Sequence, residues 1–403
     1  MKKCVILGGA RTPMAEWIGG KTGSGDRGGK FAGLSAIDLG ALAATAALER
    51  TNVEPSKIEH VVMGNALQTS GDAIYGARHV GLKSGVPKEV PALTVNRLCG
   101  SGIQAVIDGV YVIGDGASYT LCGGMESMSQ APHVIRGVRA GIRLGHARLE
   151  DSLLEALTDS FCHMLMAQTA EKLAIDRDIS RGDQDQFALR SVQRGAEAIR
   201  SGRFAEEIVP VEVSGRKGSL RVDTDDHLYQ DATLEGLARL VPAFGKDGYV
   251  TAGNASGMVD GAACLVVADE SASKRDGHQP LTEIIGWHTV GVAPEIMGIG
   301  PVEAIKGLLA KTRVKLEDID IFEINEAFAA QYLAVEKDLG LDRERVNPNG
   351  GAIALGHPLG ATGARLLLTL SIELNQSGKR YGIASACIGG GQGIAMLLKN
   401  CKL

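Results

Sequence analysis

Short apolar runs alternate with longer mixed stretches along most of the chain. The runs at 3–9, 58–63, 90–95 and 118–122 predict strands, and the stretches at 35–48, 73–84 and 103–113 predict helices. We expect the strand at 90–95 to be buried, and we expect Ser35 to cap its helix with Asp38 three residues on. Strands that alternate with helices in this way indicate an α/β architecture with a mainly parallel sheet.

The same order of elements recurs near the C-terminus. The paired stretches are 56–65 with 316–325, 95–96 with 346–347, and 118–124 with 385–391. Their similarity residue by residue is weak, so the repeated order is the stronger observation. We therefore expect two related α/β halves with an active site between them.

Residues 125–250 follow a different pattern, with long polar stretches between the two halves. They contain predicted amphipathic helices near 166–175 and 183–201, and a charged hairpin over 207–222. The predicted division is an inserted loop domain over 125–250 that covers a site, an N-terminal half over 1–124 plus 251–272, and a C-terminal half over 273–403. Beyond the insertion, the sequence predicts a glycine-rich turn, a short helix start and a buried strand that ends at Val267.

The inserted region also carries a basic run. It consists of Arg136, Arg139, Arg143, His146 and Arg148. Such a run is either a solvated face or an attractor for a phosphorylated ligand, and for any one arginine we favour the solvated face. The chain as a whole has a net charge of −5, so no overall basic field favours nucleic acid or a membrane surface as a partner.

Length and cysteine usage narrow the class of protein. The 403 residues suggest two or three domains. The 7 cysteines show no Cys-x-x-Cys pair and no metal-ligand spacing, which favours a reduced compartment with neither disulfides nor a zinc site. An immediate N-terminal strand leaves no room for a signal peptide, and no apolar run approaches the roughly 18 residues of a membrane span. The final Cys401-Lys-Leu403 only loosely resembles a peroxisomal address, so we expect a cytoplasmic protein.

The stretch Asn96–Val106 carries the first candidate for chemistry. Cys99 lies between the predicted strand and the predicted helix, flanked by Gly100 and Gly102. The positive end of a helix dipole favours a thiolate, so a thiol at this place is expected to ionise more readily and to act as a nucleophile. The alternative is a buried cysteine that serves as a small hydrophobic residue.

Three later stretches hold polar residues that a packed core would not need. Asn325 follows a predicted strand, His357 stands between a glycine and a proline, and Cys387 precedes three glycines at another strand end. Each has a structural alternative: Asn325 as a helix cap, His357 as a hydrogen-bonded core histidine, and Cys387 as core. The glycines at 389–391 do not fit G-x-G-x-x-G, which argues against a dinucleotide site.

Taken together, these four stretches resemble the thiolases, and within them the acetyl-CoA acetyltransferases. The resemblance covers essentially the whole chain, from Gly8–Pro13 through Gly123–Met128 to Gly389–Gly393. It implies a thiolase-like fold, in which two related halves form a layered αβαβα core. It also implies reversible Claisen condensation of two acetyl-CoA to acetoacetyl-CoA and CoA, by a ping-pong scheme through an acyl-cysteine, with no metal or other cofactor.

The resemblance assigns a role to each candidate. Cys99 would take the acyl group, His357 would activate Cys99, and Cys387 would remove the α-proton of acetyl-CoA. Asn325 would hold a water that, with His357, stabilises the enolate oxygen. The backbone N–H groups of Cys99 and Gly389 would form the oxyanion hole.

Resemblance also implies the contacts with coenzyme A. For CoA itself, the resemblance points to Ser256 in the turn at 253–257, with Ala252 and Phe244 nearby. The residues implied to line the pantetheine tunnel and acyl pocket are Leu157, Met166, Met258, Met297, Ala327 and Phe328. A homodimer or homotetramer is implied as well, with part of 125–146 as the candidate tetramer contact.

Four positions depart from the short-chain pattern of the family. Leu165 stands where a histidine is common, Tyr229 replaces an adenine-side arginine, Gly236 replaces a serine, and Val259 replaces an asparagine. These departures put the acyl-chain preference and the detail of CoA docking in doubt.

Three alternatives remain open. A degradative 3-ketoacyl-CoA thiolase for broader or longer chains is favoured by Leu165 and Val259, whereas the glycine-rich stretches favour the short-chain type. A ketoacyl synthase fits less well, because such enzymes pair their cysteine with two histidines, or with a histidine and an asparagine. A non-catalytic acyl-CoA or lipid carrier would be marked by a missing catalytic residue, and none is missing.

Overall fold

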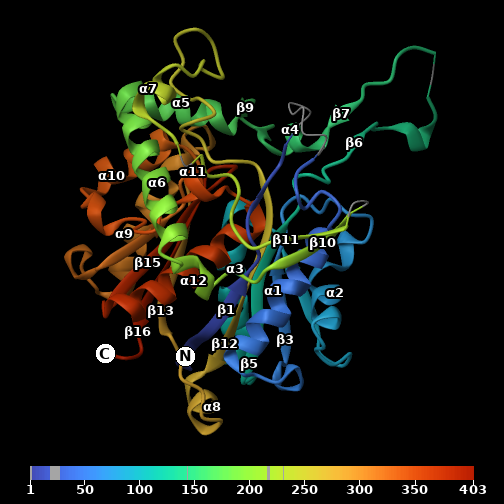
Figure 1. Ribbon diagram of the computed structural model, residues 1–403, viewed down its shortest axis with the longest axis vertical. Coiled ribbons are helices and arrows are strands. Elements are labelled where there is room, and N and C mark those ends of the chain that lie inside the picture. The colour runs from blue at the N-terminus through green and yellow to red at the C-terminus, as the bar shows by residue number, and fades with distance from the viewer. Residues whose placement is uncertain (1, 19–27, 143, 216–217, 230) are drawn as a thin grey trace.

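A large mixed sheet runs through the centre of the computed structural model, which describes residues 2–18, 28–142, 144–215, 218–229 and 231–403 (Figure 1). Among these residues the strands of the sheet follow the order β14-β15-β16-β13-β1-β12-β5-β3-β4, with β2 (Ala15–Glu16) paired to β12. The N-terminal strands are β1 (Cys4–Arg11), β3 (His60–Gly64), β4 (Ala92–Val95), β5 (Tyr119–Glu126) and β12 (Val259–Asp269). The C-terminal strands are β13 (Thr282–Gly291), β14 (Ile321–Ile324), β15 (Tyr381–Ile388) and β16 (Gln392–Asn400).

The sheet has the same internal order in each half of the chain. From its outer edge, the N-terminal half runs β4-β3-β5-β12-β1, and the C-terminal half runs β14-β15-β16-β13. An isolated parallel bridge between Phe322 and Val346 stands where β4 pairs with β3 in the other half. The two halves meet where β1 pairs briefly with β13. This repeat confirms the prediction of two related α/β halves, which lie side by side in Figure 1.

Helices form the other layers. α3 (Ser101–Gly114) and α12 (Leu359–Ser377) contact each other and pack against strands of both halves. On the outer faces, α1 (Ala36–Thr51) and α2 (Gly76–Lys83) cover the N-terminal half, and α9 (Gly300–Thr312) and α10 (Ala329–Leu339) cover the C-terminal half. α12 is buried along most of its length because apolar layers enclose it on both sides. The result is the expected αβαβα layering.

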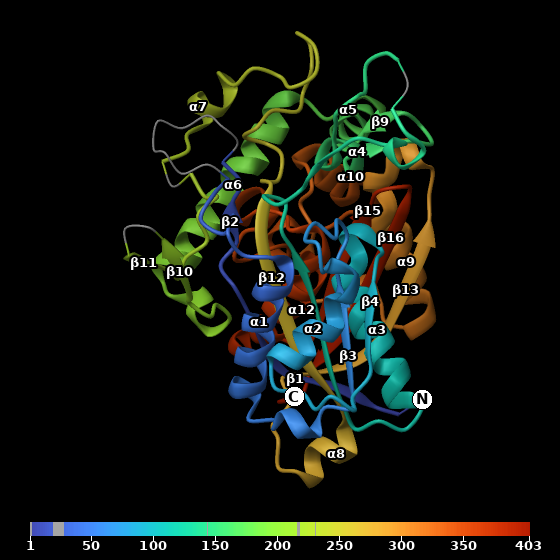
Figure 2. The ribbon, with the colours of Figure 1, turned by 90° about the vertical axis from the view of Figure 1, so that its right-hand side faces the viewer.

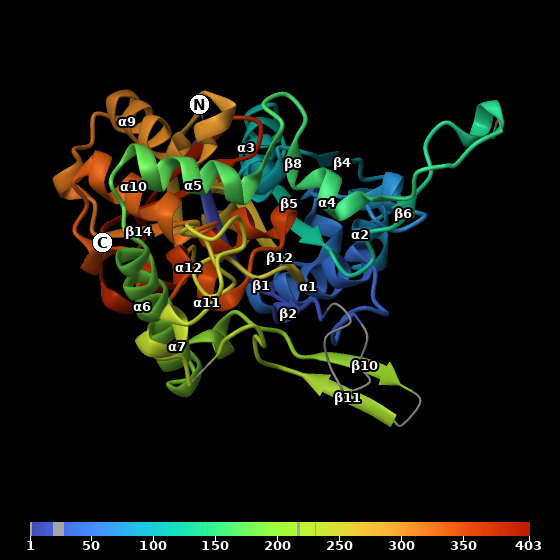
Figure 3. The same ribbon diagram turned by 90° about the horizontal axis from the view of Figure 1, so that it is seen from above.

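The inserted region lies over one end of this core (Figure 2). Its longer elements are α5 (Met166–Asp176), α6 (Arg181–Arg200), β10 (Val211–Gly215) and β11 (Gly218–Val222), which confirm the predicted helices and hairpin. Its short elements are β6 (His133–Val134), β7 (Glu150–Asp151), α4 (Ser152–Ala156), β8 (Thr158–Asp159), β9 (Met164–Leu165) and α7 (Leu234–Ala238). The β10–β11 ribbon and the arm that includes β6 both extend away from the body (Figure 3). The predicted domain boundaries stay a prediction.

Several local predictions are confirmed and others are wrong. Ser35 and Asp38 form the expected capping box. β4 is not buried, because it is an edge strand, and the side chain of Leu93 is 46% exposed. The helix start predicted after the insertion is also wrong, because the described chain forms turns over 253–258 before β12. The remaining short α-helices of the core are α8 (Glu270–Arg275) and α11 (Ala352–Leu355).

The predicted mainly parallel sheet is also a wrong expectation. β3 is parallel to β4 and to β5, and β14 is parallel to β15, but the other pairings are antiparallel. β15 and β16 form a hairpin around glycines 389–391, and β12 enters from the insertion rather than from a crossover helix. Hairpin and insertion connections permit antiparallel pairing, whereas a crossover helix imposes parallel pairing.

The cysteines, the apolar segments and the basic run can now be placed in the structure. All 7 cysteines are free thiols. Among the described residues, no helix is long and apolar enough to cross a membrane, and no three His, Cys, Asp or Glu side chains converge as metal ligands. In the basic run, Arg143 lies outside the described residues, and the others are exposed, with Arg136 paired to Glu150 at 2.8 Å.

Candidate active site

Cys99 lies on a tight turn between β4 and α3. A short 3-10 turn over 98–100 leads directly into the helix, as the sequence predicts. Leu98 has φ +47°, a left-handed conformation that is strained for leucine. Hydrogen bonds hold it there: the Leu98 N–H donates to Asn96 Oδ1 at 2.9 Å, and the Ser101 hydroxyl donates to the Leu98 carbonyl at 2.7 Å. The turn therefore presents Cys99 at the N-terminal end of a helix.

The Cys99 thiol does not ionise readily in the resting protein. Burial raises its pKa to about 11, the Glu126 carboxylate adds to the rise, and the Gly389 N–H opposes it by donating to the sulfur. The expectation of a readily ionised thiol is thus wrong, because loss of hydration outweighs the helix terminus. A base is therefore needed to ionise this thiol.

His357 is fixed in one orientation and one tautomer. Its backbone N–H donates to the Gly257 carbonyl at 2.9 Å, and the residue directly precedes Pro358, the N-cap of α12. Its Nδ1 lies 2.6 Å from Thr362 Oγ1, and the Thr362 hydroxyl donates to the Pro358 carbonyl at 3.0 Å. Because that hydroxyl has only one proton, its oxygen must accept from Nδ1–H. Nε2 is then the unprotonated nitrogen.

The unprotonated nitrogen of His357 is available as a base. Burial lowers the pKa of His357 to about 3, and the nearby Arg365 charge lowers it further, so the ring is neutral at physiological pH. Nε2 lies 3.4 Å from Asn325 Nδ2. Asn325 directly follows β14 and is anchored by its N–H to the Ser385 carbonyl at 2.9 Å. Its Oδ1 is buried without a hydrogen-bond partner among the described residues, which leaves an acceptor open beside the imidazole.

Cys387 reaches the same place from the C-terminal half. It lies near the end of β15 and is buried, and both burial and the nearness of Cys99 raise its pKa above the usual range. β15 and α12 both pack against the turn that carries Cys99. The hairpin beyond Cys387 brings the Gly389 N–H to the Cys99 sulfur. The structure therefore brings the two thiols and the glycine N–H together from opposite halves of the chain. His357 stands two residues before Leu359, which packs in one apolar cluster with Cys99.

Apolar side chains enclose both thiols. Met297, Ala327, Met166 and Phe328 form a cluster with Cys387. A second cluster contains Cys99 and Leu157. Five of the residues named from the sequence thus belong to these two clusters. A sixth, Ser256, lies next to the Cys387 cluster, because its backbone N–H donates to the Ala327 carbonyl at 3.0 Å. A lining of this kind suits an apolar acyl chain.

The other implied CoA contacts lie outside these clusters. Met258 is 36% exposed, Ala252 is exposed, and Phe244 is half-buried. Nothing in the described residues links these three side chains directly to a thiol. They stay predictions.

The departing residues lie in different environments. Val259 is buried in β12, where it fills the space beside Gly356. Tyr229 is exposed, and its hydroxyl donates to Glu16 Oε1 at 3.3 Å. Leu165 ends β9 directly before Met166, and Gly236 lies in α7.

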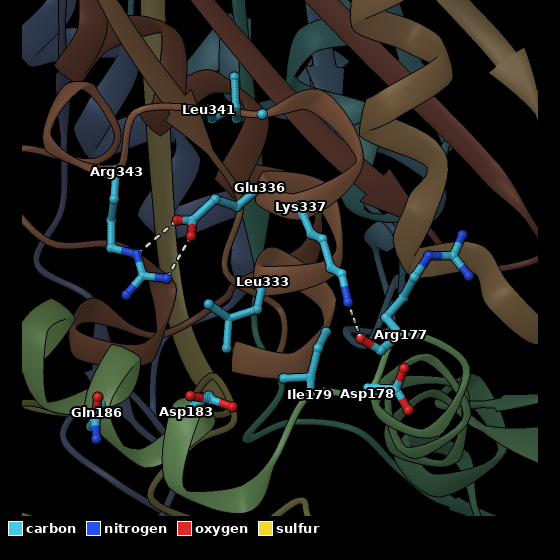
Figure 4. A pocket seen from close by; sticks show the side chains of 11 residues that line it. Arg177, Asp178, Ile179, Asp183, Gln186, Leu333, Glu336, Lys337, Leu341 and Arg343 are labelled. Atoms are coloured by element: carbon cyan, nitrogen blue, oxygen red, sulfur yellow. Dashed lines mark hydrogen bonds and ion pairs between the residues drawn. The ribbon is translucent and has the colours of Figure 1, made fainter.

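A separate surface pocket of about 360 Å³ lies between α5, α6 and α10 (Figure 4). Three of its charged groups already have partners: Arg343 faces Glu336, and the Lys337 ammonium donates to the Arg177 carbonyl at 2.6 Å. None of the predicted catalytic residues lines it. This pocket is therefore separate from the candidate site around the two thiols.

Two residues of the site were missed from the sequence. Thr362 holds the imidazole, and Glu126 accepts hydrogen bonds from segments on both sides of the site. Both stand within stretches that carry the family resemblance, but their roles depend on partners that only the fold supplies.

Comparisons with known proteins agree with this geometry. The thiolase N-terminal domain family matches residues 4–271, and the thiolase C-terminal domain family matches residues 278–400. The chain is 51% identical to human mitochondrial 3-ketoacyl-CoA thiolase over 94% of this chain and 96% of that protein. It is 45% identical to the acetyl-CoA acetyltransferase of Shinella zoogloeoides over 96% of this chain and 99% of that protein.

Solved structures give the same result. The crystal structure of human mitochondrial 3-ketoacyl-CoA thiolase in complex with CoA superposes with a TM-score of 0.94 at 48% identity, covering 99% of this chain and 98% of that one. The Bacillus anthracis acetyl-CoA acetyltransferase superposes with a TM-score of 0.95 at 42% identity, covering 99% of both chains.

Proposed function

Because the chain belongs to the thiolase family of acyltransferases, we propose that it reversibly condenses two acetyl-CoA molecules to acetoacetyl-CoA and CoA. The observation that carries this proposal is the nearness of the Cys99 and Cys387 thiols, with the Gly389 N–H at the Cys99 sulfur. The neutral His357 supports it, because it stands two residues before Leu359, which packs in one apolar cluster with Cys99. Two thiols in one site suit a reaction with two proton-coupled halves. The scheme is ping-pong, with an acyl group held on Cys99 between them.

The first half-reaction is acyl transfer. Cys99 Sγ attacks the thioester carbon of acetyl-CoA, and its proton passes to His357 Nε2. The bond from carbon to the CoA sulfur breaks, and the proton goes on to that sulfur to release CoA. The Cys99 and Gly389 N–H groups are the donors proposed for the developing oxyanion. The hydrogen bond from His357 Nδ1 to Thr362 supports this scheme because it keeps Nε2 free to accept the proton.

The second half-reaction is condensation. Cys387 gives its proton to His357 Nε2, and its sulfur then takes an α-proton from a second acetyl-CoA. The resulting carbanion attacks the acyl group on Cys99, so a carbon–carbon bond forms and the bond to Cys99 breaks. The proton on His357 passes to the Cys99 sulfur, and acetoacetyl-CoA leaves. The raised pKa of Cys387 makes its thiolate a strong base. The open acceptor on Asn325 suits the water proposed to stabilise the enolate oxygen with His357.

CoA thioesters are the only small molecules that this scheme requires. A thioester on Cys99 keeps the acyl group activated between the two steps, so we expect no metal or other cofactor. Ser256, Ala252, Phe244 and Met258 are proposed to contact CoA or its arm. The human relative solved in complex with CoA supports binding of this ligand.

A homodimer or homotetramer is proposed for the assembly, with a cytoplasmic location. Two exposed apolar features support self-association. One is the edge strand β4 with Leu93, and the other is the arm beyond β6, where Ile142 and Leu144 are strongly exposed. An unpaired edge strand and a large exposed apolar patch are both typical of contact surfaces.

A 3-ketoacyl-CoA thiolase of broader or longer chain length is the second candidate. Identity to the human 3-ketoacyl-CoA thiolase (51%) exceeds identity to the Shinella acetyltransferase (45%). Leu165, in place of the histidine of short-chain relatives, favours the same alternative. Rates of thiolysis of C4 to C16 3-ketoacyl-CoA thioesters would decide: a kcat/KM that rises with chain length would refute acetoacetyl-CoA specificity.

The acyl-enzyme itself is the test of the proposed function. The protein is incubated with acetyl-CoA and digested, and the acetylated peptide is located by mass. We expect the added acetyl group on Cys99 and none on that peptide in Cys99→Ala. Acetylation that is unchanged in Cys99→Ala would remove the assignment.

A further inference from the structure

Glu126 is a buried carboxylate with no role in the proposed chemistry. It is the last residue of β5, and its side chain is fully shielded from solvent. Four N–H donors converge on it. Oε1 accepts from Asn65 Nδ2 at 2.8 Å and from the Leu67 N–H at 3.1 Å, and Oε2 accepts from the Ala66 N–H at 3.0 Å and from the Gly360 N–H at 2.9 Å.

The donors favour the ionised form of the carboxyl group. Every contact of the two oxygens comes from an N–H group, so a carboxyl proton would have no acceptor and would displace a donor. Burial alone would favour the neutral form: it raises the pKa of Glu126 to about 7, against the opposing N–H groups. A buried charge is tolerated only where several hydrogen bonds compensate for its lost hydration.

The four donors come from both halves of the molecule. Asn65, Ala66 and Leu67 form the loop after β3, whereas Gly360 lies in the first turn of α12. Pro358 is the N-cap of α12 and has no side chain to bond the first N–H groups of the helix. Glu126 takes that place from another strand, and a negative charge is favoured at a helix N-terminus.

The two bridged segments are those that surround the reacting groups. Ala66 and Leu67 pack in one apolar cluster with Cys99, and that cluster also includes Leu359 at the start of α12. His357 stands two residues before Leu359. Any shift of α12 relative to the loop after β3 therefore moves the imidazole relative to the thiol.

Close backbone packing makes the bridge rigid. A Cβ atom on Gly124 would overlap the Gly360 carbonyl, and one on Gly360 would come within 2.6 Å of the Met125 carbonyl. Glycine at both positions lets β5 and the start of α12 approach closely enough for the carboxylate to reach the Gly360 N–H. The bridge is thus part of the seam between the halves.

We propose that Glu126 is a positioning residue that sets the His357 imidazole against the Cys99 thiol by tying the first turn of α12 to the loop after β3. The inference rests on the proposed function, because it concerns the same acyl transfer. Glu126 contacts no substrate in this scheme. Its charge acts on Cys99 in the opposite sense, since it raises the pKa of that thiol.

Glu126→Gln should therefore change two rates at Cys99 in opposite directions, one through the position of the imidazole and one through the lost charge. Glu126→Gln keeps the shape, removes the charge, and turns one oxygen into a donor that faces other donors. Acetyl transfer to Cys99 should slow by about 10- to 100-fold as the imidazole shifts. Alkylation of Cys99 by iodoacetamide at pH 8 should instead become several-fold faster, because thiolate forms more easily without the nearby negative charge.

The experiment measures both rates on the full-length protein, with each modified cysteine identified by peptide mass. The groups that act on Cys99 in this readout are Glu126, Cys387 and the Gly389 N–H. Slower acetyl transfer combined with faster alkylation supports the proposal. Rates that change in the same direction, or an acetyl transfer rate within about threefold of wild type, overturn it.

Two matched variants separate position, charge and folding. Glu126→Asp keeps the charge but shortens the reach, so acetyl transfer should fall while alkylation stays close to wild type; unchanged acetyl transfer in this variant also overturns the proposal. Asp260→Asn removes a buried carboxylate of the neighbouring strand that binds Ser129 and neither bridged segment. Its charge raises the pKa of Glu126, so its removal leaves the Glu126 carboxylate ionised and should change acetyl transfer by less than about threefold. A loss in Asp260→Asn equal to that in Glu126→Gln would assign the effect to general destabilisation and overturn the role.

Failure of this proposal can be distinguished from failure of the proposed function. A wild-type protein that takes no acetyl group from acetyl-CoA refutes the proposed function itself. A wild-type protein that is acetylated, together with a Glu126→Gln variant that is acetylated equally fast, refutes only the role of Glu126.

Discussion

Replacement of Thr362 by valine tests whether the tautomer of His357 matters. Valine keeps the shape of threonine but removes the oxygen that accepts from Nδ1–H at 2.6 Å. A buried donor that loses its acceptor costs about 1–3 kcal/mol. If that cost falls on the Nδ1–H tautomer, the fraction of His357 with a free Nε2 drops by roughly 5- to 150-fold. We expect kcat/KM for acetoacetyl-CoA thiolysis to fall by the same factor.

Two assays and one control make this prediction specific. Single-turnover acetyl transfer to Cys99 should slow as much as steady-state thiolysis, because both need Nε2 as the base. Thr362→Ser retains the hydroxyl and should stay within about threefold of wild type. Thermal unfolding of both variants shows whether the fold is intact. A folded Thr362→Val protein with a kcat/KM within about threefold of wild type would refute the reasoning.

Three further predictions follow from the site. Cys387→Ala should still take an acetyl group on Cys99 but lose condensation by about 10²- to 10⁴-fold, and normal acetoacetyl-CoA formation would exclude Cys387 from the mechanism. His357 has a pKa of about 3 in the folded protein and 6.5 as a free side chain, so the free energy of unfolding decreases as pH falls from 6.5 towards 3. Urea unfolding at pH 7.5 and 4.5 should show a smaller decrease for His357→Asn than for wild type. Gly391→Ala should lower the melting temperature and slow acetyl transfer, because φ is +81° and the new methyl group would overlap the Val292 carbonyl. Gly390→Ala has a similar φ of +79° but open space around the new methyl group, so it should show only the cost of about 1–2 kcal/mol for the backbone strain. Equal effects of the two alanines on acetyl transfer would contradict this explanation.

Local sequence patterns were enough to predict much of the fold. Ser35 and Asp38 mark the start of α1 because a capping box depends on residues three positions apart. The Cys99 turn was predicted from an apolar run, two glycines and a second apolar run, all within one short stretch. Repetition of the element order predicted the two halves. In each case the signal and the structure it specifies involve neighbouring residues.

Features that depend on distant partners could not be predicted in this way. β4 has an apolar sequence typical of a buried strand, but it is the edge strand of the sheet among the described residues. Its place in the strand order depends on how distant strands pair, which its own sequence does not specify. The Cys99 helix terminus predicts a lowered pKa, but burial of the thiol raises it instead. Glu126 in the sequence is one acidic residue after two glycines and a methionine. Its four donors come from positions about 60 and 234 residues away in the chain.

The repeat explains why the two halves contribute different chemistry. Asn65 after β3 and Asn325 after β14 occupy equivalent positions. In the N-terminal half, the amide of Asn65 donates to Glu126 and to the Met125 carbonyl, so it is committed to structure. In the C-terminal half, the amide nitrogen of Asn325 instead lies 3.4 Å from His357 Nε2. The amide oxygens of both residues are buried without a hydrogen-bond partner among the described residues, so the two copies differ in what the amide nitrogen contacts. In one copy that nitrogen binds the buried Glu126, and in the other it faces the imidazole proposed as the base.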